Sequence, residues 1–131
     1  MLGLSSPPQP LLLLIEELKE PMLKTRSIKS IATIALALGP VDTREFLVPF
    51  LSNLFHQESM ECQLAILEIT PSLIPYLGHS FHSYLLLEMV IDILCLYDEK
   101  DIRELGFSCL FKILSRVDIR KAQSMLYNSL K

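Results

Sequence analysis

Three histidines and three cysteines are the residues of this chain with the most reactive side chains. His79 and His82 lie close together in sequence, near the start of a predicted helix, and Cys95 and Cys109 follow later. A zinc site needs four converging ligands, or three and a water. No CxxC or HxxxH spacing supplies them. We therefore interpret these residues as surface histidines and core thiols, and we expect no metal and no cofactor.

Nucleophilic and acid–base chemistry is also disfavoured by the residue pattern. Cys62 or Cys109 would need a histidine and an orienting group brought close in space, but each lies in an apolar stretch. The neighbouring carboxylates of Glu16 and Glu17 point in different directions on a helix and do not form a catalytic pair. Four glycines, none of them clustered, exclude a phosphate-binding loop. We expect no enzyme; turnover abolished by changing the cysteines to serine would restore that hypothesis.

Composition narrows the class of protein. Half of the 131 residues are hydrophobic, 21% are charged and the net charge is −3. This balance excludes a disordered chain and gives no basic face for nucleic acid. The apolar run 11–15 ends at two glutamates and is too short to span a membrane. We expect a helical cytoplasmic protein, with the nucleus as a second location, that binds neither nucleic acid nor membrane.

The chain has an internal period of about 40 residues, made of two helices, which is typical of HEAT-type solenoids. Gly39 and Gly78 end two helical stretches, and Val117 follows Gly78 at the same spacing. Weaker breaks divide each unit into its two helices. The period predicts an all-α fold, an α-solenoid of three antiparallel helical hairpins plus one unpaired helix. A disordered lead-in covers residues 1–10, and the repeats cover about 11–39, 42–78, 80–116 and, in part, 118–131.

Apolar spacing places the individual helices. They are predicted at about 11–20, 22–38, 42–57, 59–77, 80–97, 99–115 and 118–130. Asp42 or Thr43 is expected to cap the third of these helices. Pro49 should kink that helix, and Pro71 and Pro75 should distort the next one, because proline lacks the amide hydrogen that a helix uses.

The second helix of each hairpin repeats a basic and a small residue. Lys24 precedes Ser27 by the same short spacing by which Arg103 precedes Gly106. The small residue allows two helices to approach closely, and the basic group can reach an acid or a carbonyl near the turn. The second repeat departs from this pattern, with Gln63 at the basic position.

Residues 27–39, SIKSIATIALALG, closely resemble the first repeat of the scaffold (A, structural) subunit of protein phosphatase 2A. Residues 14–18, 47–51 and 101–104 are also similar to that family. The resemblance covers about residues 11–130 and is specific over about 11–54. Family members carry about fifteen repeats, so the chain resembles their N-terminal portion.

The resemblance implies a non-catalytic scaffold that binds a regulatory (B-type) subunit through its intra-repeat turns. It implies binding of the catalytic subunit only if further C-terminal repeats exist. The turn residues expected to bind protein, together with two basic residues beside them, are Glu20, Pro21, Met22, Lys24, His56, Gln57, Glu58, Asp98, Glu99, Lys100 and Arg103.

Two further expectations accompany this assignment. A generic HEAT or armadillo-type adaptor in trafficking or nuclear transport is the alternative function. The last predicted helix, with Met125, Leu126 and Leu130, would leave apolar surface uncovered. We therefore expect the chain to be marginally stable or to self-associate when it is expressed alone.

Overall fold

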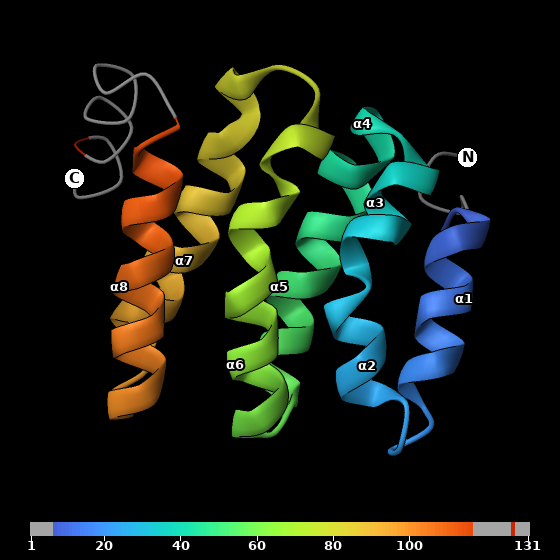
Figure 1. The fold of residues 1–131 in the computed structure, drawn as a ribbon, viewed down its shortest axis with the longest axis horizontal. Coiled ribbons are helices and arrows are strands. Elements are labelled where there is room, and N and C mark those ends of the chain that lie inside the picture. The colour runs from blue at the N-terminus through green and yellow to red at the C-terminus, as the bar shows by residue number, and fades with distance from the viewer. Residues whose placement is uncertain (1–6, 117–126, 128–131) are drawn as a thin grey trace.

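The computed structural model describes residues 7–116 and Tyr127, and within them every regular element is helical. The first hairpin joins α1 (Gln9–Leu18) to α2 (Lys24–Lys29) and α3 (Ile31–Leu38). The second joins α5 (Val48–Gln57) to α6 (Met60–Ile69), and the third joins α7 (Tyr84–Leu96) to α8 (Lys100–Leu114). The hairpins stack side by side, with α2 against α6 and α6 against α8 (Figure 1). This confirms the all-α solenoid; the predicted helix 118–130 lies outside the described residues.

The first helix begins earlier than predicted. Helix α1 starts at Gln9, so the last two residues of the expected lead-in 1–10 are helical. Pro10 lies in the first turn, where the missing amide hydrogen costs nothing because no carbonyl precedes it in the helix. The hydrophobic side of α1, with Leu11, Leu14 and Leu18, is buried.

Two details of the predicted helices were wrong. The helix expected over 22–38 is divided at Ser30, whose backbone dihedrals (φ −96°, ψ 11°) leave the helical range. Neither Asp42 nor Thr43 caps a helix start: a short α4 (Pro40–Asp42) begins directly after Gly39. The Thr43 hydroxyl instead donates to the carbonyl of Ala35, 3.1 Å away, at the end of α3. Proline at the first helical position explains the earlier start.

Each interior proline changes the helix around it, as predicted. Before Pro49 the chain forms a wider π-helical turn, η2 (Thr43–Leu47). After α6 it tightens into a 3₁₀ segment, η3 (Thr70–Leu77), which begins just before Pro71 and contains Pro75. A proline cannot donate to the carbonyl four residues earlier, so the regular α pattern fails at these points. A second 3₁₀ turn, η4 (Ser80–Ser83), precedes α7.

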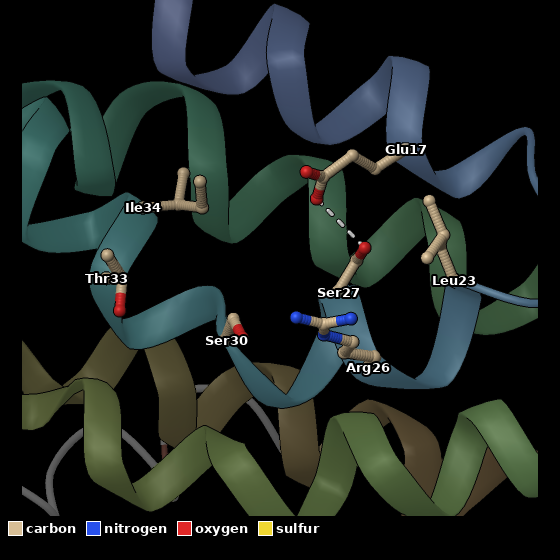
Figure 2. Close-up of a pocket in the computed structure, with 7 residues that line it drawn as sticks. All are labelled: Glu17, Leu23, Arg26, Ser27, Ser30, Thr33 and Ile34. Atoms are coloured by element: carbon tan, nitrogen blue, oxygen red, sulfur yellow. Dashed lines mark hydrogen bonds between the residues drawn. The ribbon is translucent and has the colours of Figure 1, made fainter.

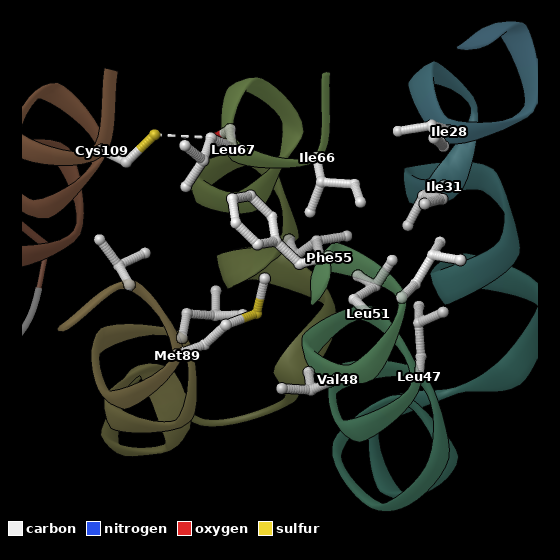
Figure 3. Packing of buried hydrophobic residues seen from close by; sticks show 14 of the residues in the cluster. Ile28, Ile31, Leu47, Val48, Leu51, Phe55, Ile66, Leu67, Met89 and Cys109 are labelled. Atoms are coloured by element: carbon white, nitrogen blue, oxygen red, sulfur yellow. Dashed lines mark hydrogen bonds between the residues drawn. The ribbon is translucent and has the colours of Figure 1, made fainter. Parts of the chain in front are cut away.

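Pro71 leaves the carbonyl of Leu67 without its usual helical donor. The thiol of Cys109, on α8, donates to this carbonyl over 2.8 Å (Figure 3). Both side chains are almost fully buried, at 0% exposed for Leu67 and 1% for Cys109. The Thr70 amide also donates to this carbonyl, but it is shared with the carbonyl of Ile66. The thiol therefore supplies a second donor where Pro71 has none. The contact also joins the second hairpin to the third.

Two glycines end the hairpins where the sequence places them. Gly39 and Gly78 have φ values of 86° and 95°, a region that other residues rarely adopt. A side chain at Gly78 would also meet the Arg44 guanidinium at 3.1 Å. Arg44 donates to the carbonyl of Leu77 over 2.7 Å, which fixes the second inter-repeat turn.

One continuous core runs between the hairpins. Phe55 is fully buried at its centre, near Leu51 and Met89 (Figure 3). Leucine and isoleucine supply most of the remaining buried side chains from all three hairpins. The high leucine content is therefore used both within each hairpin and between neighbouring hairpins.

Candidate functional site

The three intra-repeat turns lie along one edge of the solenoid. They connect α1 to α2, α5 to α6 and α7 to α8, and all three appear at the lower edge in Figure 1. The inter-repeat connections lie at the opposite edge. The arrangement follows from the antiparallel hairpins, because every second helix must start at the same end. The predicted binding residues of different repeats therefore share one edge.

The first turn is the most exposed and carries an apolar side chain. Glu20, Pro21 and Met22 are all exposed, and Met22 has 95% of its surface accessible. The Leu23 amide donates to the Glu20 carbonyl over 2.9 Å, which closes the turn. Met22 offers a flexible apolar contact that can adapt to a partner surface.

An ion pair connects the first and second turns. The Lys24 ammonium lies 3.1 Å from the Glu58 carboxylate, and their side chains are 30% and 13% exposed. Both charged groups are therefore partly shielded from solvent, and they neutralise each other. The neighbouring side chain of Gln57 is exposed.

A stacked aromatic pair connects the second and third turns. The imidazole of His56 lies parallel to the ring of Tyr97, at an interplanar angle of 7° and a centroid distance of 5.7 Å. His56 Nδ1 and the Tyr97 hydroxyl are 2.8 Å apart and share a hydrogen bond. The Phe55 ring packs edge-on against Tyr97, with centroids 5.2 Å apart. No local sequence pattern assigned a role to Tyr97, because its partner belongs to a different hairpin.

The basic residue beside the third turn points inward. Arg103 Nη1 donates to the carbonyls of Leu94 and Tyr97 over 2.8 and 3.2 Å, at the end of α7. The guanidinium also lies 5.5 Å from the centre of the Phe107 ring. The carbonyls at a helix end have no helical donor, and Arg103 supplies one. Next to it, the turn residues Asp98, Glu99 and Lys100 are exposed.

Gln63 performs the same task in the second hairpin. Its amide nitrogen donates to the carbonyl of Phe55 over 2.9 Å, at the end of α5. Gln63 is buried, at 7% exposed. The second repeat thus has a different side chain in the same role. Gln63 and Arg103 each donate a hydrogen bond to a carbonyl at the end of the preceding helix.

The predicted small residues do allow close helix packing. Ser27 is buried and its hydroxyl donates to the Glu17 carboxylate over 2.9 Å, joining α2 to α1. A side chain at Gly106 would meet Leu94 on α7 at 2.7 Å, which is closer than packed atoms approach. Each small residue thus lies where the second helix of a hairpin contacts the first.

A groove of about 500 Å³ opens on the first hairpin, bordered by α1, α2 and α3. Figure 2 shows Ser27, Ser30 and Thr33 along one side of α2–α3, with Arg26 and the Glu17 carboxylate beside them. Apolar lining comes from one leucine and one isoleucine, Leu23 and Ile34. Sequence spacing alone did not reveal this groove, because it depends on how the break at Ser30 turns α3 away from α2.

The cysteines show one departure from the sequence expectation. Cys62 and Cys109 are buried, but Cys95 is exposed. The run 93–96 is apolar on all sides of α7, so spacing does not reveal which residue faces outward. Burial, opposed by Lys112 and reinforced by Glu68, raises the pKa of Cys109 to about 11, so this thiol stays protonated.

The described part of the chain offers no metal ligand set. Residues 7–116 and Tyr127 hold no group of three or more histidine, cysteine or acidic side chains that could bind a metal.

Partial burial, then the charges of Arg44 and His79, lower the pKa of His82. None of the described helices is both long and apolar enough to cross a membrane.

Comparison with known proteins places the chain among phosphatase scaffolds. No protein-family model matches it. It is 37% identical over 97 residues to the regulatory A subunit of protein phosphatase PP2A of Saccharomyces cerevisiae, covering 72% of this chain and 15% of that protein. It is 35% identical over 119 residues to the alpha isoform of the 65 kDa regulatory A subunit of serine/threonine-protein phosphatase 2A of Arabidopsis thaliana, covering 89% and 20%.

A third relative is the protein phosphatase 2A scaffold subunit of Dictyostelium discoideum, which is 34% identical over 110 residues, covering 82% and 19%. The chain spans about a fifth of the length of these relatives or less. The likeness extends over most of the chain and implies that the stacked hairpins are HEAT repeats. Over the residues that it shares with them, the chain belongs to the family of protein phosphatase 2A scaffold subunits.

Proposed function

We propose that this chain is a non-catalytic scaffold that binds a regulatory subunit of a serine/threonine phosphatase through its turn edge. The turn edge consists of the predicted binding residues in the three intra-repeat turns: Glu20, Pro21, Met22, His56, Gln57, Glu58, Asp98, Glu99 and Lys100. One observation supports this use above all: turns of three different repeats lie side by side on one edge. The relatives are named as a regulatory subunit and a scaffold subunit of a phosphatase, which supports a phosphatase subunit as the partner.

The exposed charges of this edge favour a partner with basic side chains. Glu20, Asp98 and Glu99 are exposed acids, and Lys100 is an exposed base. The Lys24–Glu58 pair is neutral as a unit. Complementary charge mainly accelerates and orients association, and the apolar Met22 side chain adds contact area.

Lys24 and Arg103 have a supporting role in this proposal. Both are half-buried, and their polar atoms already contact Glu58 or main-chain carbonyls. They hold the turns in place, and the exposed turn residues make the contact with the partner.

We further propose the repeat bounds 11–39, 42–78 and 80–116, with a partial repeat over 118–131, and a cytoplasmic location. Binding of the catalytic subunit would require further C-terminal repeats.

A matched pair of charge changes tests the turn edge. The binding variant combines Glu20→Lys with Asp98→Lys, and the control combines Glu45→Lys with Glu68→Lys. All four positions are exposed, and both variants change the net charge equally. Binding to a purified regulatory subunit is measured by titration calorimetry at low salt.

We expect the binding variant to weaken affinity at least tenfold and the control to match the wild type. Equal affinity of both variants would refute the turn edge as the binding surface. Absence of binding by the wild-type chain to every regulatory subunit class would refute the function itself.

A further inference from the structure

Basic side chains gather at the connection between the second and third hairpins, on the edge opposite the turn edge (Figure 1). Arg44, from η2, reaches this connection, because its Nη1 donates to the Leu77 carbonyl over 2.7 Å. His79 and His82 belong to the connection itself. The structure describes both hairpins that meet here, so the cluster lies at an interior joint of the solenoid.

The two histidines lie one turn apart and close to Arg44. The His82 amide donates to the His79 carbonyl over 2.9 Å, which closes a 3₁₀ turn at the start of η4. Side chains three residues apart in such a turn stand above one another. The charges of Arg44 and His79 both act on the His82 imidazole and, after partial burial, lower its pKa. His79 is exposed, and Arg44 and His82 are half-buried, so solvent reaches the cluster.

The start of α7 adds positive charge at the same place. The first amides of a helix carry a partial positive charge, which an acid in the first turn or a capping side chain usually offsets. Helix α7 has neither. Its N-cap residue, Ser83, has helical dihedrals (φ −61°, ψ −17°), and its buried hydroxyl has no hydrogen-bond partner among the described residues. Ser83 directly follows His82, so the helix start and the imidazole are adjacent.

The carboxylates near this joint do not reverse its charge at His82. Asp42 and Glu45 flank Arg44 in sequence, but the charges that act on the His82 imidazole are those of Arg44 and His79. The segments η3 and η4, which pack against each other, contain no acidic residue. On α7 the first acid is Glu88, which is exposed in the second turn. The joint therefore favours an anion beside His82.

We propose that this joint binds a phosphate group, held by Arg44, His79, His82 and the first amides of α7. A guanidinium has five N–H donors, and among the described residues Arg44 uses one of its nitrogens on Leu77. The rest of the fork suits two oxygens of a phosphate, and a helix start is a common place for that group. A phosphate there would link η2 of the second hairpin to α7 of the third. The proposal goes beyond the turn edge and does not depend on it.

Inorganic phosphate is the first probe, added to the full isotope-labelled chain at about pH 6, where an ordinary histidine is largely protonated. Chloride keeps the ionic strength constant. Nuclear magnetic resonance should show saturable shifts centred on Gly78, His79 and His82. A bound anion favours the charged imidazole, so the pKa of His82 should be higher in phosphate than in chloride.

Variants test the assigned side chains. The double change His79→Gln and His82→Gln should weaken phosphate binding by about tenfold or more, because charge-assisted hydrogen bonds are lost. His82→Glu places a carboxylate beside the start of α7 and should abolish binding. The control, Lys29→Gln, removes an exposed base from α2 and should bind phosphate like the wild type. Circular dichroism and urea unfolding verify that each variant folds.

A second probe distinguishes a phosphate ion from a phosphorylated side chain. It is a phosphoserine peptide flanked by glycines, compared with its unphosphorylated form. Tighter binding of the phosphopeptide than of inorganic phosphate would identify a phosphorylated side chain as the ligand, and equal or weaker binding would identify the ion. The proposal is overturned if phosphate gives no saturable shift at this joint, if His82 titrates identically in both salts, or if the double variant keeps the wild-type affinity.

Discussion

Removing the thiol of Cys109 should expose the energetic cost of Pro71. The Leu67 carbonyl is buried and accepts from the Cys109 thiol over 2.8 Å. Cys109→Ala leaves that carbonyl with only the Thr70 amide, which it shares with the Ile66 carbonyl. Loss of the thiol hydrogen bond should therefore cost about 0.5–1.5 kcal/mol. Loss of the sulfur also leaves a small cavity, worth about 1 kcal/mol. We expect the variant to lose about 1.5–2.5 kcal/mol of unfolding free energy, measured by urea denaturation followed by circular dichroism.

A double-mutant cycle isolates the hydrogen bond from the cavity. Pro71→Ala restores an amide hydrogen one helical turn after Leu67, where it can complete the helical bond. In the Pro71→Ala background, Cys109→Ala should lower the unfolding free energy by only about 1 kcal/mol, because only the cavity left by the sulfur remains unfavourable. The two changes should therefore be coupled by about 0.5–1.5 kcal/mol, while the denaturant slope stays constant.

Cys62→Ala provides the matched control. Cys62 is also buried, at 4% exposed, and among the described residues the structure gives its thiol no hydrogen-bond partner. Cys62→Ala should lower the unfolding free energy by the same amount in the wild-type and Pro71→Ala backgrounds. If Cys109→Ala also cost the same in both backgrounds, the thiol would not be the donor that compensates for the proline.

Three further predictions concern thiols and helix ends. Cys95 is exposed and Cys109 is not, so a thiol reagent should label Cys95 in the folded chain and Cys109 only after unfolding, as mass spectrometry would show. Burial raises the pKa of Cys109 from 9.0 to about 11, so its contribution to stability is complete below pH 9 and is lost as the pH rises through 11. Cys109→Ser should flatten the alkaline fall of unfolding free energy; an identical fall would contradict the assignment. Gln63→Ala leaves the Phe55 carbonyl without its side-chain donor and should cost about 1–3 kcal/mol in urea unfolding, whereas Gln57→Ala, at an exposed position, should cost less than about 0.5 kcal/mol.

The period of the sequence was sufficient to predict the architecture. Gly39 and Gly78 mark positive-φ turns that only glycine adopts easily, so their spacing gives the repeat directly. The effects of Pro49 and Pro71 were predictable for a similar reason, because a missing amide hydrogen acts locally. Features set by one residue and its immediate neighbours are thus visible in the sequence.

Contacts between repeats were not predictable in the same way. The pairs Lys24–Glu58 and His56–Tyr97 join residues of different hairpins that are far apart in sequence. Whether such side chains meet depends on the angle between stacked hairpins, which no single repeat determines. The exposure of Cys95 was missed because apolar residues surround it in sequence on every side of α7.

The two contacts between neighbouring turns differ in how they should respond to salt. The joint between the first and second hairpins holds its turns together by an ion pair, which dissolved salt weakens. The joint between the second and third uses a stacked pair of rings, whose attraction is not screened. Added salt should therefore relax the curvature of the rod at one end only, and small-angle X-ray scattering of wild type and Lys24→Met would measure the change.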